Sequence, residues 1–193
     1  MRLRHSATCA MLVTVLVTGA TGLAAGAEGQ RTFRHLQTSG GQIASAIEAC
    51  YRLSPACQRL IDEIEASSTI VYIRPGQCRI GIRGSCLMFS VAESGVRYLQ
   101  IVLDKDLDGE CLVAAAAHEL QHALEVARAP EVVDLKSLRL LYTRIGFSVH
   151  ESGMREDWET DEAQRIALVV SKEVKRSLRA APLAFNEARV GKE

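Results

Sequence analysis

The chain lacks an excess of charge of either sign: among its 193 residues, 23 Lys and Arg balance 23 Asp and Glu. No window of Lys and Arg is dense enough to form a basic groove, so we expect no nucleic-acid partner. Aromatic residues are also scarce, at 5%. The apolar side chains are mostly Ala, Leu, Val and Ile, which is typical of packed helices with a small sheet. A hydrophobic fraction of 48% still supplies one buried core, and the length indicates a single domain.

The N-terminal region lacks a hydrophobic run that could serve as a lasting membrane anchor. A short positive region precedes an apolar stretch over residues 9–25, which contains three Thr and two Gly and is therefore a poor membrane span. The small residues Ala25-Gly26-Ala27 suit cleavage by a signal peptidase. We therefore predict a signal peptide over residues 1–27 and a flexible leader over residues 28–41. The mature protein is expected to be secreted or periplasmic, with no stable membrane span after cleavage.

No Cys-x-x-Cys pair occurs in the sequence, which argues against a metal site made of thiolates. Cysteines of an exported protein favour disulfide bonds. Two local pairs, Cys50 with Cys57 and Cys78 with Cys86, each close a short loop around a turn signal. Five cysteines remain after removal of the signal peptide, so one thiol is left over and can link two copies of the chain into a dimer.

Hydrophobic periodicity predicts an α+β fold. Helical spacing and turn signals, followed by β-branched segments, indicate a small three-stranded antiparallel sheet packed with several helices. The expected strands cover residues 69–74, 86–92 and 97–103, and the expected helices cover residues 42–53, a segment from Pro55, and residues 110–128, 133–145 and 155–180. We place this single domain at residues 42–182, followed by a C-terminal tail over residues 183–193.

The Ala-rich helix contains the sequence His118-Glu119-Leu120-Gln121-His122, which has the pattern HExxH. Residues four apart lie on the same side of a helix, so the two imidazoles can bind one zinc ion. Glu119 lies next to them and can act as the general base for a water on that ion. Glu125, three residues beyond His122, can orient an imidazole by a hydrogen bond without itself binding the metal.

This pentapeptide resembles the motif helix of the zincin metallopeptidases, and three strands followed by that helix and a further helix are similar to their minimal core. The stretch over residues 114–127 also resembles small secreted bacterial proteins with an HELQH motif. The metzincin branch has Gly and His where this chain has Glu125 and Arg128, and the branch with a downstream Asp finds no counterpart. The gluzincin type remains. It implies a third ligand from a Glu on a later helix, and a substrate extended along the edge strand, here residues 97–103.

The last predicted helix offers Glu159 as the third zinc ligand. Its buried stripe includes Ile166, and seven residues back from Ile166 the same stripe reaches Glu159. A buried carboxylate needs a compensating charge, which a zinc ion supplies. The segment Trp158-Glu159-Thr160-Asp161 is also similar to the aromatic-Glu-x-Asp arrangement of some gluzincins, which implies that Asp161 supports the motif histidines. Three alternatives for the third ligand stay open: Glu162, His150 and Glu131.

These residues predict a secreted zinc metallopeptidase that hydrolyses peptide or protein substrates, with Glu119 as general base. The family resemblance implies further donors to the transition state, for which His150 and Tyr142 are candidates. A second hypothesis is a non-catalytic exported domain that a metal stabilises and that binds a partner in the cell envelope. A third is a zinc hydrolase of a non-peptide amide or ester, because the motif can polarise any carbonyl group.

Overall fold

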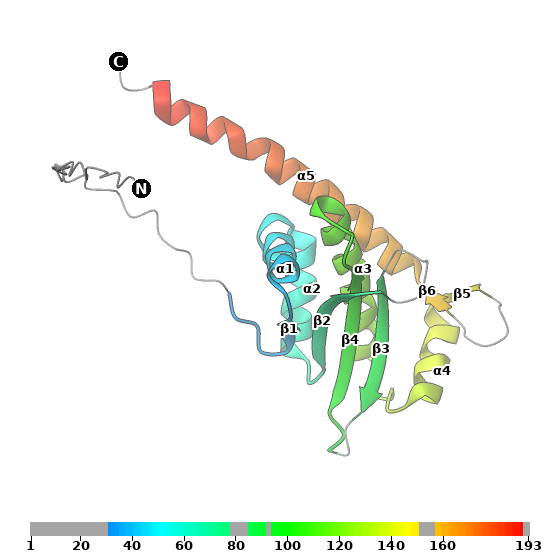
Figure 1. Ribbon diagram of the computed structural model, residues 1–193. Helices are drawn as coiled ribbons and strands as arrows, with labels where there is room; N and C mark the ends of the chain where they lie inside the picture. The colour runs from blue at the N-terminus through cyan, green and yellow to red at the C-terminus, as the bar shows by residue number, and fades with distance from the viewer. Residues whose placement is uncertain (1–30, 78–84, 92–93, 151–156, 191–193) are drawn as a thin grey trace, which may run out of the picture. The chain divides into compact units, whose positions relative to one another are not determined.

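Figure 1 shows the fold as a computed structural model, which describes residues 31–77, 85–91, 94–150 and 157–190. The chain divides into the units Met1–Gln30 and Arg31–Glu193. The first contains the predicted signal peptide and lies outside the described residues. The second unit confirms the α+β class. Its elements are β1 (Leu36–Thr38), α1 (Gly41–Leu53), α2 (Pro55–Ala66), β2 (Ile70–Gly76), β3 (Ser85–Val91), β4 (Arg97–Asp104), α3 (Gly109–Ala127), α4 (Leu135–Ile145), β5 (Phe147–His150), β6 (Asp157–Glu159) and α5 (Asp161–Val190).

The main sheet has the strand order β1-β2-β4-β3 and is mixed. β2 pairs in parallel with both β1 and β4, whereas β3 pairs antiparallel with β4 at the edge. The prediction of three antiparallel strands is therefore wrong: a fourth strand is present and two of the pairings are parallel. The prediction that residues 97–103 form an edge strand is also wrong, because these residues belong to the inner strand β4. Alternation along a chain locates strands, but it does not determine which strands become neighbours.

The core lies between the sheet and a layer formed by α1, α2 and α3. Leu99 and Ile101 of β4 are fully buried, as are Ile61 of α2 and Leu120 of α3. The last helix, α5, packs mainly along α3 and also contacts α1 and α2. α3 is thus enclosed by the sheet on one side and by α5 on another, which fixes the helix that carries the histidines. None of the helices in the described ranges is long and apolar enough to cross a membrane.

The N-terminal strand β1 lies within the segment over residues 28–41 that the sequence predicts as a flexible leader. Both oxygens of the Glu65 carboxylate hold it, accepting hydrogen bonds from the backbone N–H groups of Arg34, His35 and Leu36 at 2.8–2.9 Å. Leu36 is buried in the core. Three residues are too few to show a period in the sequence. The carboxylate that fixes them lies about 30 residues further along the chain, so neighbouring residues do not predict this strand.

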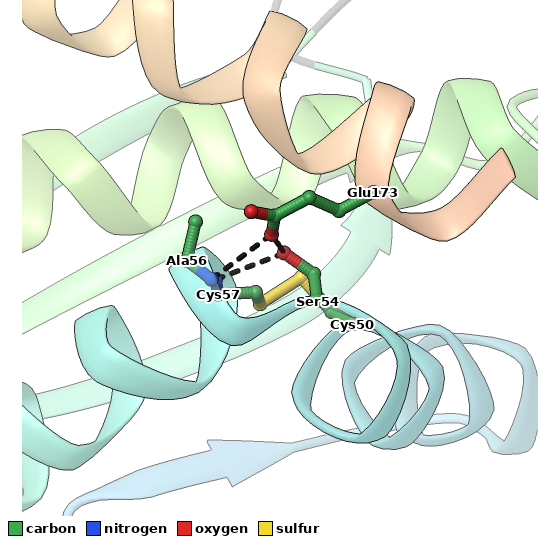
Figure 2. Close-up of a disulfide and its surroundings, with 5 residues drawn as sticks. All are labelled: Cys50, Ser54, Ala56, Cys57 and Glu173. Atoms are coloured by element: carbon green, nitrogen blue, oxygen red, sulfur yellow. Dashed lines mark hydrogen bonds between the residues drawn. A yellow bond between two sulfur atoms is a disulfide. The ribbon is translucent and has the colours of Figure 1, made fainter. Parts of the chain in front are cut away.

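The Cys50–Cys57 disulfide predicted from the sequence is present and links the end of α1 to the start of α2 (Figure 2). Ser54 lies in the turn between the two helices and caps α2, accepting a hydrogen bond from the backbone N–H of Cys57. From α5, the Glu173 carboxylate accepts hydrogen bonds from the Ser54 hydroxyl at 2.5 Å and from the backbone N–H of Ala56 at 3.0 Å. One carboxylate therefore ties the last helix to the first two.

Two further cysteines, Cys86 and Cys111, lie within the residues that the structure describes. Cys86 also takes part in a disulfide bond, and its predicted partner Cys78 lies outside the described residues. Cys111, on the first turns of α3, is free and exposed. A dimer linked through an unpaired thiol remains a prediction.

Two elements near the C-terminus differ from the prediction of one helix over residues 155–180. The chain first forms the short strand β6, and α5 begins only at Asp161. α5 then continues through Pro182 to Val190, so most of the predicted tail over residues 183–193 is helical. Pro182 removes one backbone donor from the helix without ending it.

Arg97, at the start of β4, fixes the C-terminal end of α3. Its guanidinium donates hydrogen bonds to the carbonyl oxygens of Val126 and Ala129 at 2.8 Å and of Ala127 at 3.2 Å. The last carbonyls of a helix have no partner within it and carry partial negative charge, so a buried cation there is well placed. This anchor sets how far α3 can slide along the sheet, and hence where its histidines lie.

Candidate metal centre

The two motif histidines lie one turn apart on α3. The small residues before them are alanines, of which Ala116 and Ala117 are fully buried and let the helix pack closely on its neighbours. The rings of His118 and His122 lie edge to face, with their centroids 4.9 Å apart. The His118 side chain is 21% exposed and that of His122 is 7% exposed, so the pair lies at the margin of the core, open to solvent on the His118 side.

The hairpin of β5 and β6 brings Glu159 against these two rings. One carboxylate oxygen, Oε2, lies 3.3 Å from Nε2 of His118, and the other, Oε1, lies 3.4 Å from Nε2 of His122. One ligand atom from each of the three residues can be chosen so that all of them lie within 4.8 Å of one another. Among the described residues this is the one such group of His, Cys, Asp and Glu.

Glu159 is thus close to both histidines, but it lies on a strand and not on a helix as predicted. It ends β6, and Thr160 separates it from the first residue of α5. In the hairpin Glu159 pairs with Phe147, the residue that follows Gly146. The spacing argument from Ile166 assumed that the helix reaches back to residue 155, which is wrong because α5 starts at Asp161.

The spacing of the donor atoms is compatible with a bound divalent metal ion. Two ligand atoms that each lie about 2.05 Å from a zinc ion are separated by about 3.3 Å when the coordination is tetrahedral. Each of the two nitrogen-to-oxygen distances between the imidazoles and Glu159, 3.3 and 3.4 Å, is close to that separation, and each involves a different oxygen of the carboxylate. Two imidazoles and one carboxylate also form a donor set that suits zinc and similar divalent ions. His118, His122 and Glu159 can therefore hold such an ion.

The charge around the histidines also favours a cation. Glu119 is 4% exposed, and the side chains of Glu125 and Glu159 are 9% and 16% exposed. Burial alone would raise the pKa of Glu159. Hydrogen bonds from His122 and from the backbone N–H of Thr160, with the charges of His118 and His122, lower its pKa below the ordinary value. The carboxylates of Glu125 and Glu159 both contact His122, and their negative charge favours a cation at this place.

In the metal-free protein, a proton on His122 balances part of the negative charge of the surrounding carboxylates. Burial lowers the pKa of this imidazole, but hydrogen bonds to Glu125 and Glu159 and the charges of Glu119 and Glu125 outweigh burial and raise its pKa to about 9. His122 donates from Nδ1 to Oε2 of Glu125 at 3.0 Å. A metal ion at Nε2 has to displace the proton there, so binding of the ion is coupled to proton release.

Glu125 and Tyr142 surround His122. Oε1 of Glu125 accepts hydrogen bonds from the Thr160 hydroxyl at 2.8 Å and from the Gln121 amide at 3.4 Å. The Tyr142 ring stands edge-on to the imidazole, and its hydroxyl donates to the backbone carbonyl of His122 at 3.4 Å. Burial, followed by the charges of nearby carboxylates, holds the pKa of Tyr142 well above its ordinary value, so this hydroxyl keeps its proton.

The other predicted site residues lie elsewhere. Asp161 is exposed at the start of α5, and Glu125 has the place at Nδ1 of His122 that the resemblance would give to a supporting carboxylate. Glu162 pairs with Arg165 on the surface, and Glu131 pairs with Arg144. His150 ends β5, but its side chain lies outside what the structure describes. Thr160 was not singled out by the sequence, although Thr-Asp-Glu at a helix start is a capping signal.

Gly146 permits the approach of β6, and a side chain there should disturb the site. A Cβ atom at Gly146 would overlap the backbone carbonyl of Glu159 and approach the Tyr142 carbonyl at 3.3 Å. We expect Gly146→Ala to reduce stability by about 1–3 kcal/mol and to weaken metal binding, because Glu159 has to shift. The matched control is Gly41→Ala, where the added Cβ meets nothing within 4 Å. Thermal unfolding with and without zinc measures both effects, and equal zinc affinity in the two variants would contradict the expectation.

The stability of the metal-free protein should fall as pH rises through the His122 titration. The folded-state pKa of about 9 exceeds the ordinary value of 6.5. The stabilisation is therefore complete below about pH 6.5 and is lost between about pH 6.5 and pH 9, on the order of 1–3 kcal/mol. Urea unfolding of chelator-treated protein from pH 6 to pH 10 measures this loss. His122→Gln should lack the decline, and parallel curves for variant and wild type would refute the assignment.

Comparison with known proteins gives no match: no family model, no curated protein and no solved structure is similar enough to this chain to be matched.

Proposed function

We propose that this chain is a secreted or periplasmic zinc metallopeptidase of the gluzincin type. The observation that carries the proposal is the convergence of His118, His122 and Glu159, whose donor atoms lie within 4.8 Å of one another, with Glu119 buried close to them. Two imidazoles and a carboxylate form the ligand set of peptidases that keep a fourth position open. The Cys50–Cys57 disulfide supports an oxidising compartment.

In this proposal zinc, when bound, polarises the scissile carbonyl group and lowers the pKa of water, so that nucleophilic attack can occur at neutral pH. Glu119 accepts the proton of the attacking water and then donates it to the leaving amine. Glu119 is buried, and its charge is among those that raise the pKa of His122, so it lies close to the proposed ligands as this role requires. Glu125 holds His122 in place.

The antiparallel edge strand β3, in place of residues 97–103, is the proposed binding site for an extended substrate. β4 pairs on both of its sides, whereas β3 pairs with β4 alone in the sheet that the structure describes. A polypeptide that pairs with the free side of β3 would gain backbone hydrogen bonds without requiring a particular sequence. This supports unfolded or flexible protein segments as the substrate class, because a folded chain does not offer a free backbone.

Metal content together with hydrolysis of an unfolded protein tests the proposal. The exported protein, purified without chelator, should contain zinc and should cleave a reduced, fluorescently labelled unfolded protein. A chelator should stop cleavage, and added zinc should restore it. Ester and non-peptide amide substrates in parallel separate a peptidase from a general hydrolase. Protein that takes up no zinc, or cleavage that the chelator does not affect, would rule out the proposal.

One observation favours a second function, a metal-stabilised exported domain without catalysis. Glu159 directs a different oxygen toward each histidine. A carboxylate that coordinates through both oxygens would fill the position that a catalytic site leaves open for water. In that case zinc would link α3 to β6 and stabilise the fold only. A rise in melting temperature with zinc, without cleavage of unfolded protein, ester or amide, would favour this function.

A further inference from the structure

Thr160 has a place in the site that neither the motif nor the proposed ligand set assigns to it. It follows Glu159 directly, precedes the first residue of α5 and is 2% exposed. Its backbone N–H donates to Oε1 of Glu159 at 2.8 Å. Its hydroxyl oxygen accepts a hydrogen bond from the backbone N–H of Ala163 at 3.1 Å, which makes Thr160 the N-cap of α5.

Of the two hydrogen-bond partners of the Thr160 hydroxyl, only one can accept its proton. The N–H of Ala163 is a donor, so the hydroxyl oxygen accepts there, and the proton points to Oε1 of Glu125 at 2.8 Å. The other oxygen of Glu125 accepts from Nδ1 of His122 at 3.0 Å. A carboxylate fixed in this way keeps the proton of a neutral His122 on Nδ1, so that the lone pair of Nε2 faces Glu159 and is available to a metal.

Thr160 therefore interacts with two proposed ligands from different parts of the chain, with Glu159 directly and with His122 through Glu125. Through its backbone it holds the carboxylate of Glu159, and through its hydroxyl and Glu125 it orients the ring of His122. The α5 cap fixes the Thr160 hydroxyl itself. The start of α5 and the ring of His122 are thus joined by a continuous chain of hydrogen bonds in buried surroundings, where such bonds are costly to lose.

We infer that Thr160 is a positioning residue of the metal centre, and that its hydroxyl, acting through Glu125, sets the zinc affinity by fixing the orientation of His122. The inference rests on the proposed metal site, but not on catalysis. Partners that orient a metal-bound histidine typically change affinity about 10–100-fold when they are removed. A residue that only capped α5 would change stability and leave zinc affinity unaltered.

Zinc affinity of substituted chains, measured by competition with a chromogenic chelator, tests this role. Thr160→Val and Thr160→Ala both remove the hydroxyl and should bind zinc about 10–100-fold more weakly, whereas Thr160→Ser should restore the wild-type affinity. Asp134→Ala is the matched control, because Asp134 caps α4 through the N–H of Ser137 and lies outside the site. It should lower the melting temperature without changing zinc affinity.

A double-substitution cycle separates action through Glu125 from an independent effect. If the hydroxyl acts through Glu125, then Thr160→Val combined with Glu125→Ala should bind zinc no more weakly than Glu125→Ala alone. Wild-type zinc affinity in the Val and Ala variants, or multiplied losses in the double variant, would overturn the inference and leave the proposed function intact. Absence of zinc binding by the wild-type protein would defeat both.

Discussion

Glu119→Gln is expected to lower hydrolysis of an unfolded protein by about 10²–10⁴-fold, the range that a general base contributes, while the protein keeps its zinc. Glutamine has nearly the same shape as glutamate and fits the same buried position, but it cannot accept a proton from water. Both motif histidines and Glu159 are unchanged, so the donor atoms for the ion remain. Activity and bound zinc are measured on the same preparation.

Glu110→Gln is the matched control for this substitution. It removes a carboxylate from the same helix by the same chemical change, at a partly exposed position where Glu110 pairs with Lys175 at 2.7 Å. Its activity should equal that of the wild type. If the Glu119→Gln variant and the wild type cleaved the substrate equally well, Glu119 would not be the general base. Loss of zinc along with activity would mean that Glu119 acts on the site in another way.

Glu159→Ala should weaken zinc binding by well over a hundredfold, more than the about 10–100-fold typical of residues that only support a ligand. The substitution removes one of three donors, and it leaves two imidazoles beside Glu119 and Glu125 without the carboxylate that faces them both. Equilibrium dialysis against zinc, with the metal measured on both sides, gives the affinity directly. Hydrolysis should be lost in parallel.

Glu162→Ala is the control that tests the choice of ligand. Glu162 lies only three residues away, on the first turn of α5, and is exposed with Arg165 as its partner. Zinc affinity should therefore stay at the wild-type value. If Glu162→Ala lost zinc and Glu159→Ala kept it, the assignment of the third ligand would be wrong. Unchanged affinity in both variants would direct the search to His150 and Glu131.

The first four helices were located well from the sequence, because their signals are local, whereas the bounds of α5 were not. Ser54 and Pro55 predict the boundary between α1 and α2, and the structure places Ser54 as the N-cap of α2 with proline as its first residue. Gly146 likewise ends α4 at the predicted residue. Each signal acts within one helical turn, so neighbouring residues suffice to predict it.

The sheet shows where local reasoning ends. The β-branched segments were located within two residues at each end, but the parallel pairing of β2 with β4 joins Ile70 to Tyr98 across the whole of β3. Nothing in either segment specifies that partner. β1, β5 and β6 contain three, four and three residues, too few for alternation to stand out from chance.

The candidate site was predicted in part for the right reason and in part for a wrong one. His118 and His122 are neighbours because a helix places residues four apart on one side. Glu159 was chosen from a helical stripe that does not exist at that position, although burial of its carboxylate was a sound argument. The error also hid Thr160, because a helix assumed to start near residue 155 leaves no role for a cap at residue 160.

The anchoring of β1 has a consequence for how the chain can be shortened. Because β1 covers the side of β2 that faces away from β4, removal of residues up to 41 would leave the backbone groups of Val71 and Ile73 without their partner strand. An uncovered strand edge promotes association between copies. The smallest stable form of the protein should therefore begin before Arg34, and any processing enzyme that trims the N-terminus has to leave the backbone that Glu65 holds.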